Sequence, residues 1–175
     1  MRTLVAAVLF FLVGLGHVGA ATFSLPEAGV SFQAPDGFTK LSAQEIAIKY
    51  PASPAPSFVV GDHRRTTSIA FDLKPNALPA DRLPEAKAAF ESFFDRRIPR
   101  VEWKQKKLIE LQGQQWIYLE MTSRAVDTDI HNIMLVTPRY GKMLMFNFNS
   151  TREEFPHMET ALRKSIQSIS LRNRP

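Results

Sequence analysis

The 175-residue chain contains no cysteine, which excludes disulfide bonds, thiolate zinc sites and a cysteine nucleophile. Its 22 lysine and arginine residues outnumber its 17 aspartate and glutamate residues, and the formal net charge of +5 favours acidic partners or anionic surfaces. The sequence carries no nucleic-acid reader motif, so we expect no nucleic-acid partner.

Residues 1–20 have the pattern of a secretory signal peptide. Arg2 precedes an apolar run over residues 4–13, and small residues follow it. The run is too short to cross a bilayer comfortably, because a membrane-spanning helix needs about 20 residues. The small side chains of Val18-Gly19-Ala20 predict cleavage after Ala20, with an uncleaved membrane anchor as the alternative. Since no cysteine follows to be acylated, we expect a soluble periplasmic or secreted product without stable membrane insertion.

Residues 21–175 have the length of a single domain, and their first third predicts short strands and one short helix. Alternating side chains predict a strand over residues 30–35, which ends at a Pro-Asp-Gly turn. Ser42 and Glu45 form a capping box, and the helix that they begin ends at Tyr50 because the following proline disfavours helical geometry. Further strands are predicted over residues 58–60 and 69–73.

A longer helix is predicted from Asp81 or Leu83 to Arg97, with a proline in the first turn, where a missing N–H is tolerated. Several of its residues recur at helical spacing: Ala86, Phe90, Phe93, Phe94 and Arg97. We interpret the phenylalanines among them as one stripe that faces the core.

The second half of the chain predicts two β-hairpins. Residues 101–111 and 115–124 flank a Gln-Gly-Gln turn, and residues 130–137 and 143–149 flank a turn over residues 138–142. The second hairpin is apolar on both strand faces, which is typical of a sheet covered on both sides. The chain has too few strands for a second full sheet, so we expect helices as the cover.

The last predicted helix has the clearest periodicity. One apolar stripe runs along it: Phe155, Met158, Leu162, Ile166 and Ile169. We predict that this stripe packs in the core, with membrane-surface binding as the alternative. The order of elements predicts an α+β fold: a three-layer α/β/α sandwich with a mostly antiparallel sheet and a long C-terminal helix.

No catalytic motif stands out, and we predict that the protein is not an enzyme. Metalloprotease, phosphate-loop, nucleophile-elbow and dinucleotide motifs do not occur in the sequence. Asp62-His63 with Ser57 or Ser68 comes nearest to a hydrolase triad. Adjacent side chains of a strand point to opposite faces, however, so Asp62 would not orient His63.

Asp127, Asp129 and His131 form the best candidate for a metal site, because two carboxylates and an imidazole in a turn can converge on a divalent cation. Aspartate is also common in hairpin loops, where it binds local backbone donors. Three ligands are fewer than the six to eight oxygens that calcium takes. We therefore expect no metal and no cofactor.

A basic run is the feature best suited to recognition: Arg96, Arg97, Arg100, Lys104, Lys106 and Lys107. On a strand that begins at Val101, Glu102, Lys104 and Lys106 would share one solvated face, with Trp103 on the other. Two interpretations stay open. The run is either an edge strand whose lysines discourage aggregation, or a patch that binds an acidic surface of a protein partner.

Three short segments carry a resemblance to a known family: Phe32-Gln33-Ala34-Pro35-Asp36-Gly37-Phe38, Leu111-Gln112-Gly113-Gln114-Gln115-Trp116, and Glu154-Phe155 with the helix that closes at Ser165-Ile166-Gln167-Ser168-Ile169. On these segments the chain resembles the PsbP-like superfamily over residues 22–171. The resemblance implies a single sandwich domain whose relatives act mostly by binding other proteins. It supplies no catalytic residue.

We therefore expect an exported, non-catalytic binding domain, an adaptor or accessory protein of the cell envelope. A periplasmic immunity protein that neutralises a toxin is the alternative. A hydrolase or small-ligand carrier is a third reading, and it would require a cleft that the sequence alone does not display.

Overall fold

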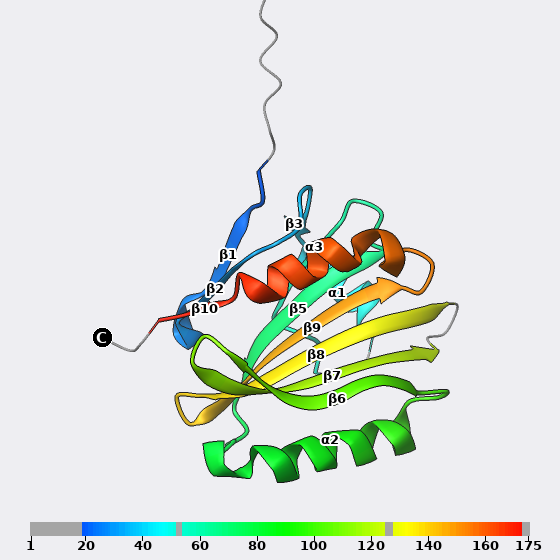
Figure 1. Cartoon of the computed structure of the whole chain (residues 1–175). Helices are drawn as coiled ribbons and strands as arrows, with labels where there is room; N and C mark the ends of the chain where they lie inside the picture. The colour runs from blue at the N-terminus through cyan, green and yellow to red at the C-terminus, as the bar shows by residue number, and fades with distance from the viewer. Residues whose placement is uncertain (1–18, 52–53, 125–127, 173–175) are drawn as a thin grey trace, which may run out of the picture.

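The computed structural model describes residues 19–51, 54–124 and 128–172, so nearly all of the predicted signal peptide lies outside the described residues. Within these ranges the chain forms two β-sheets, three α-helices and two short 3-10 helices (Figure 1). The helices are α1 (Ala43–Lys49), α2 (Leu83–Arg97), α3 (Phe155–Gln167), η1 (Pro26–Ala28) and η2 (Ala80–Arg82).

The large sheet has seven strands in the order β3-β4-β5-β9-β8-β7-β6, and every neighbouring pair is antiparallel. Its strands are β3 (Thr39–Lys40), β4 (Phe58–Gly61), β5 (Thr67–Lys74), β6 (Glu102–Leu111), β7 (Gln114–Arg124), β8 (Asp129–Arg139) and β9 (Lys142–Thr151). The predicted α+β class with a mostly antiparallel sheet is confirmed.

Both predicted hairpins are present, and each closes through two residues with positive φ, Gln112-Gly113 and Tyr140-Gly141. Turns of this kind match the right-handed twist of the strands that they join, and glycine adopts positive φ without strain. The second turn is shorter than the sequence predicts. Pro138 and Arg139 continue strand β8 and pair with the start of β9.

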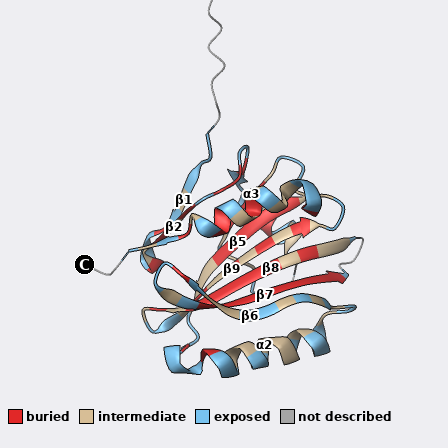
Figure 2. Cartoon of the chain, viewed as in Figure 1, coloured by how far each residue is buried: buried red, intermediate tan, exposed pale blue. Residues whose placement is uncertain are grey.

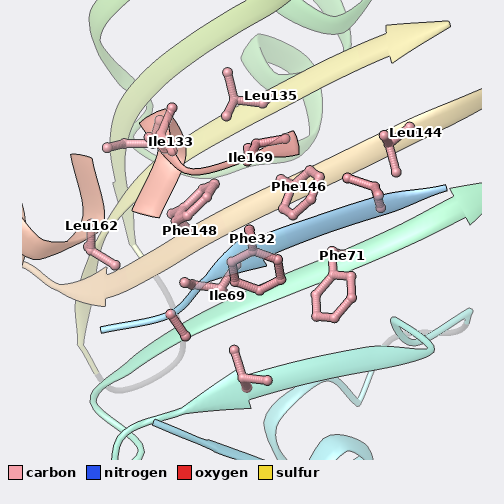
Figure 3. Close-up of a cluster of buried hydrophobic side chains, with 14 of the residues drawn as sticks. Phe32, Ile69, Phe71, Ile133, Leu135, Leu144, Phe146, Phe148, Leu162 and Ile169 are labelled. Carbon is pink, nitrogen blue, oxygen red and sulfur yellow. The ribbon is translucent and has the colours of Figure 1, made fainter. Parts of the chain in front are cut away.

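A small second sheet covers part of one face of the large sheet. It contains β1 (Thr22–Leu25), β2 (Val30–Gln33) and β10 (Ser170–Leu171) in the order β1-β2-β10. Its Phe32 ring lies edge-on to Phe71 and Phe146 of the large sheet, with centroids 5.0 and 5.4 Å apart (Figure 3). The expectation that helices cover the large sheet is therefore wrong for this face. Strands β1 and β2 near the N-terminus pair with β10 near the C-terminus and form a second sheet there.

Helix α3 covers the rest of that face, and it lies on the opposite side of the large sheet from α2 (Figure 1). Phe155, Leu162 and Ile166 of the predicted stripe are buried. The helix ends at Gln167, so Ile169 is buried from the turn that follows rather than from the helix. No helix of the described ranges combines the length and the apolar character that crossing a bilayer requires.

Helices α1 and α2 pack on the other face. Helix α1 begins with the predicted capping box and buries Ile46 against β4 and β5. Helix α2 packs Phe90 and Phe94 over β7 and β8. Phe93 is an exception to the predicted core stripe, because its side chain is 50% exposed. An α-helix turns about 100° per residue, so a residue next to Phe94 points along the flank of the helix rather than at the sheet.

The buried side of α3 gives the first test of this packing. Leu162 is fully buried, whereas Ile48 of α1 is 75% exposed (burial is mapped in Figure 2). Leu162→Ala should lower the free energy of unfolding by about 2–5 kcal/mol, because it leaves a cavity in the core. Ile48→Ala should change it by no more than about 0.5 kcal/mol. Urea unfolding measures both, and equal midpoints for the two variants would contradict the packing described here.

Candidate functional site

A groove crosses the face of the large sheet that α1 and α2 share, because neither helix covers the strip between them. It is a cavity of about 700 Å³ that continues into a second cavity of about 260 Å³. Both cavities are lined by the C-terminal end of α1, the C-terminal end of α2 and the middle of β9. The residues that line both are Lys49, Tyr50, Phe94, Ile98 and Asn147.

The walls of the groove are mostly apolar. Phe94 and Ile98 form the wall at the end of α2, and Tyr50 with Pro54 and Pro56 forms the wall after α1. A concave, largely apolar site of this volume is typical of ligand and partner binding.

The floor of the groove is polar, and asparagines supply it. Asn149 Nδ2 donates to the Tyr50 hydroxyl at 3.2 Å, and Asn132 Nδ2 donates to Ser123 Oγ at 3.1 Å. Asn147 lies two residues before Asn149 on the same strand, opposite Ala70 of β5. Its Oδ1 is buried and has no hydrogen-bond partner among the described residues. A buried carbonyl oxygen without a partner costs free energy, and a donor from a bound molecule could reach this oxygen only after the amide rotates toward the groove.

The flank of α2 opposite β6 carries further side chains beside the groove. Glu91 and Asp95 contact β6, through Lys106 and Trp103 respectively. An α-helix turns about 100° per residue, so residues two positions after Glu91 and Asp95 lie on the opposite side of α2. Phe93 and Arg97 are therefore on the flank that faces β9 and β5. The exposed Phe93 ring packs edge-on against Phe94, with centroids 5.6 Å apart. The apolar wall of the groove thus continues onto the outer surface.

Positive charge surrounds this surface. Lys49 lines the groove and donates to the backbone of Arg65 at 2.9 Å, and burial lowers the pKa of its ammonium group. Asp72 is the one carboxylate among the described lining residues, and Lys74 neutralises it at 2.5 Å. Arg97 is exposed and makes no ion pair or hydrogen bond within the described part of the chain.

The structure does not bring the six basic residues of the predicted patch onto one face. A β-bulge between Trp103 and Gln105 shifts the register of β6, so Lys106 and Trp103 share the α2 face and Lys107 lies on the α3 face. The predicted placement of Lys106 opposite Trp103 is therefore wrong. Arg96, Arg97 and Arg100 lie at the end of α2, where the first two also complement the negative end of the helix dipole. Partner binding by this set stays a prediction.

A second polar cluster is buried on the α3 face. Glu120 of β7 is 3% exposed and accepts hydrogen bonds from the Tyr118 hydroxyl at 2.6 Å and from Arg163 of α3 at 3.0 Å. The Glu120 carboxylate makes a third contact, with Nε2 of His131 on β8 at 2.8 Å. The His131 ring stacks on Phe155, which closes it off from solvent.

This cluster is built to hold a carboxylate in its ionised form. Burial raises the pKa of Glu120, but the hydrogen bonds from His131, Tyr118 and Arg163 outweigh burial and lower the pKa to about 2. Burial and the neighbouring Glu120 raise the pKa of the Tyr118 hydroxyl. The hydrogen bonds join β7, β8 and α3, so we assign the cluster a structural role.

The other predicted candidates do not assemble into sites. Asp62 accepts hydrogen bonds from Thr66 and Thr67 of its own turn and makes no contact with His63 that would orient it. Asp127 lies outside the described residues, and Asp129 pairs with Arg152 at 3.6 Å. No group of three His, Asp or Glu side chains in the described ranges has an arrangement that would hold a metal ion.

Sequence reasoning missed the groove, although one signal for it is present. Alternate residues of β9 point to the α1–α2 face, and along this face the side chains change from Met143 and Met145 to Asn147 and Asn149. The change from thioether to amide marks where the cover by α2 ends.

Solved structures share this fold. Cyanobacterial PsbP of Synechocystis has 18% identity and a TM-score of 0.64, over 94% of this chain and 99% of that one. A Pseudomonas aeruginosa protein of unknown function has 18% identity and a TM-score of 0.53, over 89% and 98%. LpqN of Mycobacterium tuberculosis, involved in cell envelope biogenesis, has 14% identity and a TM-score of 0.53, over 89% and 86%. No family model matches the chain, and no curated protein matches it in sequence. The fold is PsbP-like.

Substitution of Glu120 tests the structural role of the buried cluster. Glu120→Gln should destabilise the protein by about 1–3 kcal/mol at neutral pH, because it removes the charge that the hydrogen bonds from Tyr118, His131 and Arg163 hold in a buried position. The carboxyl has a pKa of about 2 when folded and about 4.3 when unfolded, so its stabilisation is complete above the unfolded value and is lost as pH falls toward 2. The difference in urea midpoint between parent and variant should therefore narrow over that acid range.

Glu159→Gln is the matched control, because Glu159 pairs with the same Arg163 from an exposed position. Exposed pairs contribute about 0–1 kcal/mol, so this variant should unfold nearly as the parent does. If both variants behave alike at neutral pH, the cluster does not anchor α3.

Proposed function

We propose that this PsbP-like chain is an exported, non-catalytic protein-binding domain of the cell envelope, and that it binds its partner in the groove between α1 and α2. We also assign it a three-layer α/β/α architecture, with α3 and the small sheet as one outer layer and α1 and α2 as the other. The proposal goes beyond the fold, because a shared fold does not by itself imply a shared function.

The observation that carries the proposal is the combination of an open groove with an exposed aromatic ring at its edge. Phe93 is 50% exposed, and its ring packs against Phe94, which lines the groove together with Ile98. Aromatic residues and arginine are the side chains most often found at the energetic centre of protein interfaces. Phe93 and Arg97 lie one helical turn apart on the same flank of α2. Phe93 could therefore pack against an apolar side chain of the partner while Arg97 contacts a neighbouring charge.

The chemistry of the described side chains supports binding rather than catalysis. The ionisable groups that line the groove are two lysines, Asp72 and Tyr50, and Asp72 is already paired with Lys74. A nucleophile needs a base within hydrogen-bond reach. Tyr50 instead bonds Asn149 and Ser68, neither of which is a base. On the other face, Glu120 and His131 are closed off beneath Phe155.

Export is the first part of the proposal that can be tested. The arrangement of charge, apolar core and small residues in residues 1–20 predicts a mature chain that begins at Ala21. Intact-mass measurement on protein from the native envelope fraction should give the mass of residues 21–175. A mass that retains Met1 would mean an uncleaved anchor, and a purely cytosolic location would contradict export.

Photo-crosslinking tests the groove itself. A benzophenone amino acid in place of Phe93 should crosslink a protein in the envelope fraction, because this position lies at the edge of the groove. The same photo-crosslinker in place of Ile48 is the matched control, since Ile48 is exposed and apolar but points away from the sheet. Adding Asn147→Leu to the Phe93 position should abolish the crosslink while the fold is kept.

Three results would contradict the proposal. Equal crosslinking from both positions would mean that the photo-crosslinker reacts without specific binding. A crosslink that Asn147→Leu leaves unchanged would place the interface outside the groove. A product whose added mass is that of a small molecule would make the chain a ligand carrier.

A further inference from the structure

We propose that the segment bound in the groove is extended and acidic, with apolar side chains that alternate with aspartate or glutamate. This inference rests on the proposed function and specifies the partner. Three properties of the groove carry it: the apolar wall, the unpaired amide on the floor and the positive rim.

The apolar wall sets the first requirement. Phe94, Ile98, Pro54 and Pro56 present hydrocarbon to the cavity, and the open volume above the floor is about 700 Å³. A partner therefore gains by burying apolar side chains against these residues, in proportion to the area removed from water. A fully polar segment would leave this wall exposed and would gain little.

The floor requires a partner whose backbone is free to form hydrogen bonds. Asn147 Oδ1 has no partner among the described residues, whereas the amides of Asn132 and Asn149 are bonded to Ser123 and Tyr50. Rotation of the Asn147 side chain by half a turn presents either its oxygen or its N–H₂ group to the groove. A helical segment satisfies its own backbone N–H and C=O groups, but an extended segment offers both to a side-chain amide.

The rim requires negative charge. Lys49 lines the groove. Arg97 is exposed and does not itself line the groove, but the helical repeat puts it on the flank of α2 opposite the one that contacts β6. Asp72, the carboxylate of the described lining, is neutralised by Lys74. Side chains of an extended segment point alternately to opposite sides, so apolar residues can face the wall while acidic residues face the rim. A basic segment would meet like charges here, which disfavours association.

Selection from a random heptapeptide library displayed on phage tests this inference directly. The bait is the folded mature chain. We expect the enriched peptides to combine Asp or Glu with Leu, Ile, Met or Phe. We also expect them to compete with the protein that the photo-crosslinker at position 93 captures. The best peptide, labelled with fluorescein, is then measured by fluorescence anisotropy.

Matched variants separate the contributions of the groove. Phe93→Ala should weaken the peptide about tenfold or more, as loss of an aromatic anchor does. Arg97→Glu should weaken it about tenfold, and affinity for the parent should fall between about 0.1 M and 1 M salt, where screening becomes strong. Ile48→Ala and Lys142→Glu should leave affinity unchanged, since Ile48 lies away from the groove and the exposed Lys142 lies at the start of β9, outside the groove lining.

Three properties of the enriched peptides would overturn the inference. The peptides could be basic, they could become helical on binding as measured by circular dichroism, or they could bind the Asn147→Leu variant as tightly as the parent. Equal weakening by Lys142→Glu and Arg97→Glu would mean that the effect of charge is not specific to the groove and would overturn it as well. If no peptide is enriched while crosslinking from position 93 still captures a protein, the proposed function stands and this inference fails. If neither experiment gives a protein or peptide, both fail.

Discussion

The large sheet carries apolar side chains on both faces, so each face has to be covered, and the two covers differ. On one face α3 and the small sheet close over a continuous aromatic core around Phe32, Phe71 and Phe146. On the other face the cover is α2 and the seven-residue α1, which lie over opposite halves of the sheet. The strip between them stays open. There the side chains of β9 change from methionine to asparagine, which tolerates water or a bound polar group.

The closed face also explains why a buried charge is stable in this protein. Glu120 lies beneath α3, and its ionised form is held by groups from two strands and a helix: Tyr118, His131 and Arg163. The bonds from His131 and Arg163 cross between elements, so α3 is positioned by a directional contact as well as by its apolar stripe. A face held in this way is a rigid support for the sheet, so the binding proposed for its other face would need little reorganisation of the fold.

Local patterns in the sequence predict most of the elements, because capping, alternation and helical periodicity are properties of neighbouring residues. The capping box at Ser42 and the buried stripe around Leu162 are examples. Features that depend on distant packing escape such patterns. The bulge near Lys104 exchanges the faces of β6, and the exposure of Phe93 depends on how α2 is rotated on the sheet. The groove itself exists because α1 is short. The asparagines of β9 indicate a polar strip, but not the two helices that border it.

The absence of cysteine permits a direct measurement of the central claim, that this strip is the binding surface. A Phe93→Cys variant and an Ile48→Cys variant each carry a single exposed thiol, one at the groove and one on the outer side of α1. The rate of maleimide labelling is measured for each variant with and without the envelope fraction. The account predicts that the envelope fraction slows labelling at position 93 and leaves position 48 unchanged. Equal rates at position 93 with and without the envelope fraction, or slowing at position 48 alone, would contradict it.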